Sequence, residues 1–305
     1  MGVFVAFLAF IGFGLDYFYL GTVSEDLFLP LGTIVAIAVG SGSAVWSLQS
    51  GAKAILISTG ALPADPANPS HKQLLNVVDE MTIASGLPRP RVYVIPDPDP
   101  NAFATGKNPD NSTVAATQGL LDSLNREELQ AVIAHEMSHI RNYDIRLMTV
   151  VAALVGSILL LSDWARRAMW YGGGSRRKRS SGGGLGAILL IAWIIGIAVA
   201  PLVSQLMAMA VSRKREYLAD ASGAELTRNP LGLANALRKI ESAAAPTASI
   251  KRGAAHLCII DPLGRKVNLK EGFTAELFGT HPPVEKRIVA LKAMAYQYER
   301  LKTSA

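Results

Sequence analysis

The chain has 305 residues, of which 50% are apolar and only 18% are charged, and its mean hydropathy is +0.27. Soluble domains carry about 25% charged residues, so this composition argues against a wholly soluble protein. The formal charge is +6, and the single cysteine, Cys258, excludes an internal disulfide framework and a cysteine-based zinc knuckle.

Four apolar segments are candidates to cross a bilayer, which takes about 20 apolar residues per helix. They cover residues 3–20, 27–48, 147–162 and 185–211. Asp16 interrupts the first, and the second carries Ala36, Gly40 and Ser41, where small side chains allow close helix packing. The third is short, so it suits a buried or re-entrant helix as well as a span. No cleavage site of small residues follows the first segment, so we expect an anchor and not a removed signal peptide.

These segments divide the chain into four predicted parts. Residues 1–48 are an anchor of two transmembrane helices, residues 147–211 are an apolar helical hairpin, and residues 49–146 and 212–305 are two halves of one domain. The hairpin contains a basic run at residues 176–179 between glycines. We interpret this run as a flexible loop that touches anionic lipid headgroups, and we expect no nucleic-acid partner.

The first half of the polar domain contains a helix and then a small sheet. Apolar residues at helical spacing predict a helix over residues 74–82, which Gly86 and Pro88 end. Strands are predicted at residues 91–95, 101–105 and 113–116, and a turn at residues 107–110 joins the last two.

A second helix begins at a capping box and leads towards the third apolar segment. Asn125 is the predicted N-cap, and Glu128 stands three residues on. In the second half we expect helices over residues 212–227, 231–245 and 284–301, and a strand over residues 256–260. The fold class is therefore α+β, mostly helical, with one small sheet.

The pattern His-Glu-x-x-His at residues 135–139 indicates a metal centre. His135 and His139 are one helical turn apart on the same face, so both rings can reach a zinc ion at about 2.0–2.1 Å. Glu136 can then act as general base towards a water whose pKa the metal lowers to about 7. The pattern alone also occurs by chance in other proteins. A third ligand elsewhere in the chain is therefore needed to support a metal centre.

Glu216 is the predicted third ligand. The predicted hairpin returns the chain to its starting point and brings Glu216 beside His139. Asp220, four residues on, is placed to accept a hydrogen bond from the outer nitrogen of His135. The alternative interpretation is that Glu216 and Asp220, together with the basic residues 213–215, form a solvated helix face.

Four further groups have either a candidate role in the site or a structural one. His281, before two prolines, could donate to the developing oxyanion. An exposed edge strand that binds a substrate backbone could be formed by Asn101, Ala102, Phe103 and Ala104. An edge strand without a role in binding is an equally good interpretation. His71 is expected at the surface, and His256 with Cys258 is expected to pack in the core.

Together the motifs resemble those of the HtpX-type membrane metalloproteases, relatives of the CAAX prenyl endopeptidases and of the mitochondrial stress protease Oma. The resemblance covers most of the chain. It rests on NAFATG at 101–106, AHEMSHI at 134–140 with Asp144 beyond, REYLAD at 215–220, and THPP at 280–283 followed by Arg287.

The resemblance implies a zincin-like protease domain joined to transmembrane helices. It implies a zinc endopeptidase of the cytoplasmic membrane, facing the cytosol, that degrades misfolded or damaged membrane proteins without nucleotide. His135, His139 and Glu216 would bind one Zn²⁺, Glu136 would be the base, and Asp144 would join Asp220 around the ligands. Family members usually carry a basic residue near the N-terminus, whereas the first here is Lys53.

The distribution of basic residues leaves the topology open. The loop between the first two apolar segments contains Glu25 and Asp26 and no basic residue, so it is expected outside and the active site inside. The loop between the third and fourth segments is as basic as the catalytic side. Either the third segment does not cross fully or the earlier segments set the orientation.

Two alternative functions remain. One is a specific processing protease of the CAAX prenyl endopeptidase type, although the chain has fewer predicted spans than that large helical chamber needs. The other is a non-enzymatic membrane scaffold that carries the metal motif by chance. Metal analysis of the His135→Ala variant separates an enzyme from a scaffold.

Overall fold

A computed structural model describes residues 2–16, 30–152, 213–243, 249–250, 257–260 and 281–303. Its contacts divide the chain into two compact units, Met1–Ser47 with Leu154–Leu206, and Leu48–Ala153 with Met207–Ala305. The domain boundaries expected from the sequence stay a prediction. The predicted spans over residues 153–162 and 185–211 lie outside the described residues.

The first unit contains α1 (Gly2–Leu15) and most of α2 (Leu31–Ser58), which pack closely through small residues. A Cβ on Gly12 would lie 2.7 Å from the Ala36 Cβ, and one on Gly40 would lie 2.8 Å from Leu8. Close packing at Ala36 and Gly40 was expected, and it is confirmed.

Asp16, which interrupts the first apolar segment, caps the second helix. Its carboxylate accepts the backbone N–H groups of Gly32 and Thr33 at 2.6 and 2.7 Å, and the Thr33 hydroxyl at 2.7 Å. The start of a helix has N–H groups without helical partners, and a carboxylate satisfies them. Its place in an apolar segment is thereby explained.

No described helix is by itself long and apolar enough to cross a bilayer. Within α2, only the parts Leu31–Ser47 and Gln49–Ser58 taken together have the length and apolar composition of a span. The transmembrane spans therefore stay a prediction.

The second unit begins with α3 (Pro69–Ser85) and a mixed four-stranded sheet in the order β1-β2-β4-β3. The strands are β1 (Leu62–Pro63), β2 (Arg91–Ile95), β3 (Ala102–Gly106) and β4 (Ser112–Thr117). β2 runs parallel to β4, while β1 and β3 run antiparallel to their neighbours. The predicted helix and three strands are confirmed, and β3 is an edge strand.

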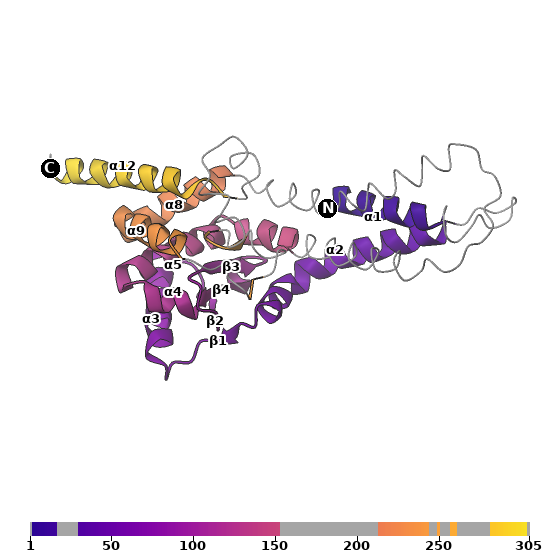
Figure 1. The fold of residues 1–305 in the computed structure, drawn as a ribbon, viewed down its shortest axis with the longest axis horizontal. Helices are drawn as coiled ribbons and strands as arrows, with labels where there is room; N and C mark the ends of the chain where they lie inside the picture. The colour runs from indigo at the N-terminus through magenta and orange to yellow at the C-terminus, as the bar shows by residue number, and fades with distance from the viewer. Residues whose placement is uncertain are drawn as a thin grey trace, which may run out of the picture. The chain divides into compact units, whose positions relative to one another are not determined.

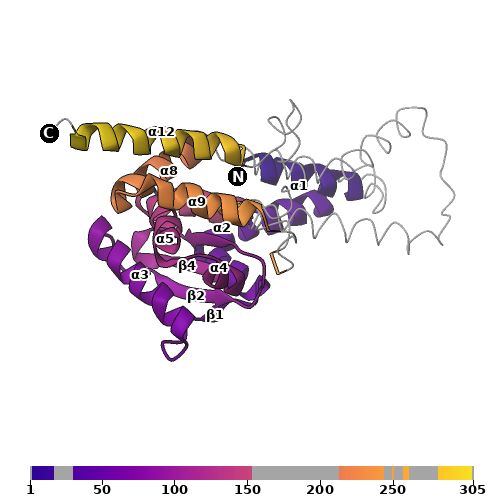
Figure 2. The same cartoon turned by 60° about the vertical axis from the view of Figure 1, so that its left-hand side comes forward.

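The central element is α5 (Arg126–Arg141), which contacts α3, β3, α8 (Arg213–Thr227) and α9 (Pro230–Glu241). It lies between the sheet and the pair α8 and α9, while α12 (Val284–Thr303) packs against that pair (Figures 1 and 2). The predicted capping box of Asn125 and Glu128 begins α5, and a short helix, α4 (Gln118–Ser123), precedes it. The apolar residues of this unit form one buried core around α5.

One expectation about the elements was wrong. Residues 257–260 are not a strand; they are buried irregular chain, whose apolar side chains fill the core without a strand ladder. The helix α5 leads towards the third apolar segment, as expected, with a break between them. It ends at Asn142 and Tyr143, where Tyr143 has a positive φ of 60°, and helical structure resumes at Asp144.

Candidate metal centre

Two helices bring the predicted metal ligands together. His135 and His139 point from α5, and Glu216 comes from the first turn of α8. The helices approach closely because α8 carries Gly223, where a Cβ would lie 2.9 Å from the backbone nitrogen of His135. A larger residue at that position would push Glu216 away from the histidines.

The separations of the ligand atoms suit a tetrahedral metal ion. The Nε2 atoms of His135 and His139 are 3.2 Å apart, and the Glu216 carboxylate oxygens lie 3.8 and 3.6 Å from them. A tetrahedral zinc with bonds of about 2.0–2.1 Å separates its ligand atoms by about 3.3–3.4 Å. These three residues form the metal-competent group of the described part of the chain.

Buried polar atoms around this group lack aligned hydrogen-bond partners. Among the described residues they include both carboxylate oxygens of Glu136, Oε2 of Glu216 and both ring nitrogens of His281. His281 Nδ1 lies 3.2 Å from Glu216 Oε2, so its ring faces the centre. Buried polar atoms are rarely left unsatisfied, and a cation with a water molecule is what these would bind. The residues therefore fit a metal ion.

A carboxylate stands behind each histidine ring. Asp220 Oδ1 lies 3.0 Å from Nδ1 of His135, and Asp144 Oδ2 lies 3.2 Å from Nδ1 of His139. The interruption of α5 explains the second contact, because residues five apart on a continuous helix do not face each other. Both carboxylates hold the outer nitrogen and leave Nε2 directed at the metal position.

The charges of the centre favour a bound cation. Burial raises the pKa of Glu136 and outweighs the nearby histidines. Burial lowers the pKa of His139, but Asp144 and Glu216 outweigh this and raise it to about 9. Burial also raises the pKa of Glu216, but His281 and His139 bring it well below its usual range. The carboxylates around His139 thus stabilise positive charge at that side of the centre, which a metal ion would supply.

Arg287, which belongs to the motif after residues 280–283, is a fully buried cation for which no role was predicted. Its Nε and Nη2 donate to the two oxygens of Asp220 at 2.8 and 2.7 Å. Burial raises the pKa of Asp220, but Arg287 outweighs this and lowers it to about 2. The available signal was its position, because Arg287 shares a helix face with Val284, Ile288 and Leu291, and a cation among apolar residues needs a buried partner.

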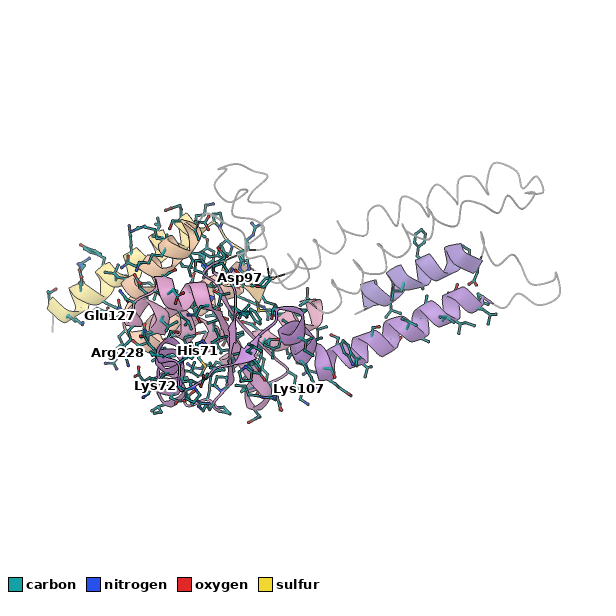
Figure 3. The ribbon with its side chains drawn as sticks, turned by 60° about the horizontal axis from the view of Figure 1, so that its bottom comes forward. His71, Lys72, Asp97, Lys107, Glu127 and Arg228 are labelled. Carbon is teal, nitrogen blue, oxygen red and sulfur yellow. The ribbon has the colours of Figure 1, made fainter. Side chains whose placement is uncertain are left out.

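The remaining candidates lie at different distances from the centre. His71 lies at the start of α3, where Nδ1 accepts the Asp65 N–H and Nε2 contacts Gln118, so it takes no part (Figure 3). His256 lies outside the described residues, and Cys258 is buried. The strand expected to be exposed at Asn101 to Ala104 is instead buried: Ala102 to Ala104 belong to the edge strand β3, and Asn101 beside them is 0% exposed.

Replacing Asp220 by asparagine should weaken metal binding without abolishing it. The variant keeps the size and one acceptor oxygen but loses the charge that faces His135 and Arg287, so we expect a loss of about 10- to 100-fold in metal affinity or turnover. Titration of zinc into the metal-free protein measures the affinity. Asp110→Asn, at an exposed aspartate, is the matched control. Equal affinity and turnover in the two variants would show that Asp220 does not act on the centre.

Comparison with known proteins identifies the family. The model of peptidase family M48 matches residues 69–295. The protease HtpX homolog of Caldanaerobacter subterraneus is 48% identical over 242 residues, which are 79% of this chain and 78% of that protein. The protease HtpX homolog of Thermoanaerobacter pseudethanolicus is 43% identical over 96% of this chain and 93% of that protein.

A solved structure shares the fold. The crystal structure of S. mikatae Ste24p matches 95% of this chain with a TM-score of 0.52 and 18% identity, and this chain spans 62% of that one. The HtpX-type resemblance of the sequence motifs is confirmed by these comparisons, and so is the mostly helical fold with a small sheet. The chain belongs to peptidase family M48, with HtpX proteases among its relatives.

Proposed function

We propose that this peptidase is a membrane-bound zinc endopeptidase that hydrolyses misfolded or damaged membrane proteins. The observation that supports this most directly is the buried group of His135, His139 and Glu216 beside the carboxylate of Glu136. Three protein ligands leave the fourth position of a tetrahedral metal to water or substrate, which is the arrangement of catalytic zinc sites.

Each residue of the centre has a part in hydrolysis. A bound zinc ion supplies the Lewis acidity that lowers the pKa of water and polarises the scissile carbonyl. Glu136, whose burial raises its pKa, takes a proton from the attacking water and passes it to the leaving amine. His281, whose Nδ1 lies 3.2 Å from Oε2 of Glu216, would donate to the oxyanion that develops on the carbonyl. Asp220 and Asp144 keep the two histidine rings oriented.

The membrane location rests on the apolar segments of the sequence. Residues 27–48 are free of charge, and α2 covers most of them. The acidic loop ahead of that segment favours an outside position for the loop, and thus a cytosolic position for the catalytic centre in the cytoplasmic membrane. Substrates would then be polypeptide segments close to the lipid surface.

The observations do not favour the processing of prenylated peptides. The likeness to Ste24p is one of fold, at 18% identity, and it carries no information about the substrate. The relatives with 43–48% identity are HtpX homologues. We therefore retain the broader endopeptidase.

Metal reconstitution tests the proposal. The purified full-length chain in proteoliposomes should contain about one zinc ion per chain, as expected for a single site with three protein ligands. It should cleave an unfolded membrane protein without ATP, lose that activity on chelation, and regain it when zinc is added. A zinc-loaded protein that leaves unfolded membrane proteins intact, but cuts a prenylated peptide, would favour the processing protease.

A further inference from the structure

Residues 257–260 lie against the outer edge of β3, beside the metal centre. All four residues are at most 2% exposed. Ile259 donates its backbone N–H to the carbonyl oxygen of Ala102 at 2.9 Å, and the side-chain amide of Asn101 donates to the carbonyl oxygen of Ile260 at 3.0 Å. The opposite edge of β3 pairs with β4. The segment therefore occupies the edge that the sheet leaves open.

Arg287 ties the same segment to the metal centre. Its Nη1 donates to the carbonyl oxygen of Ile259 at 2.8 Å and lies 3.8 Å from Oε2 of Glu216. The other guanidinium nitrogens bind Asp220, which faces His135. The guanidinium group of Arg287 thus lies between the carbonyl oxygen of Ile259 and the candidate metal ligand Glu216.

Both main-chain groups of Ile259 are bound in the way that a substrate residue would require. The N–H pairs with the edge of a strand, and the carbonyl meets a buried cation next to the metal ligands. A peptide that adds to a sheet edge forms main-chain hydrogen bonds of this kind. A substrate and residues 257–260 would compete for the same carbonyl of Ala102.

We propose that residues 257–260 are an internal strap that occupies the place of the substrate along β3, so that the free enzyme is autoinhibited. A polypeptide binds only when the strap leaves. This inference rests on the proposed endopeptidase function. It agrees with the burial of the centre, where His135 and Glu136 are 0% and 1% exposed.

Loosening the strap should raise activity. In the zinc-loaded full-length chain, we expect Ile259→Ala to increase kcat/KM for an unfolded membrane protein about tenfold, because a buried isoleucine side chain stabilises the closed state by at least that factor. The control is Ile240→Ala, which removes the same side chain from the buried core at α9. It should lower thermal stability without raising kcat/KM. If kcat/KM for Ile259→Ala also fails to rise, as expected for Ile240→Ala, the strap proposal is wrong.

Hydrogen exchange provides a second test that does not depend on turnover. In zinc-loaded Glu136→Gln protein, saturation with the unfolded substrate should increase amide exchange of residues 257–260 while β2 and β4 stay protected. Unchanged protection with substrate bound would show that the strap is a permanent part of the fold. If the zinc-loaded wild type cleaves no polypeptide, the proposed endopeptidase function is wrong, and the strap proposal, which rests on it, is wrong too. If the wild type cleaves the substrate but residues 257–260 stay protected, only the strap proposal is wrong.

Discussion

Replacing Glu136 by glutamine should abolish peptide hydrolysis while the metal stays bound. The amide keeps the size of the side chain but cannot take a proton from water, and general-base catalysis contributes about 10²- to 10⁴-fold to such reactions. Neither oxygen of Glu136 is needed as a ligand, because His135, His139 and Glu216 form the metal-competent group. Cleavage of an unfolded membrane protein and zinc content per chain are measured on the same preparation.

The chain provides a matched control on the same helix. Glu127 is exposed near the start of α5, away from the centre, and Glu127→Gln makes the identical chemical change (Figure 3). This control should keep both zinc and wild-type turnover. Turnover retained by Glu136→Gln at full zinc content would remove Glu136 from the role of base.

Local sequence patterns were sufficient to predict the parts of the centre that lie on one helix. The capping box of Asn125 and Glu128 determines where α5 begins, and helical periodicity then places His135 and His139 on one face. Asp220 was predicted in the same way, because it lies one turn after Glu216. These predictions needed only the geometry of a regular helix.

Contacts between distant segments could not be predicted in this way. The pairing of Arg287 with Asp220, and of Ile259 with Ala102, joins residues far apart in the chain, and no local pattern encodes it. Residues 257–260 resemble a strand because Ile259 and Ile260 favour one, yet this segment meets β3 through one main-chain hydrogen bond and one bond from the Asn101 side chain, without a ladder. The turn at Tyr143, which brings Asp144 to His139, also lacks the glycine that usually marks a positive φ.

The second large effect is expected for Glu216→Ala, which should lose its metal under mild chelation. Two histidines alone leave one protein ligand too few for a catalytic zinc site. The loss of affinity should exceed the roughly 10- to 100-fold expected for groups behind the ligands, such as Asp220. Glu225→Ala removes an exposed carboxylate from the same helix and should keep its zinc.

Two measurements separate loss of the metal from loss of the fold. Zinc is measured by competition with a chelator of known affinity, and the zinc-dependent rise in Tm is measured in parallel. A ligand that binds only the folded state raises Tm with its concentration, so wild type and Glu225→Ala should show this rise. Glu216→Gln fills the volume of the original side chain, so it should fold and still show a much smaller rise. If Glu216→Ala and Glu216→Gln both retain full zinc, the third ligand lies elsewhere, and the close approach of α8 to α5 at Gly223 serves packing alone.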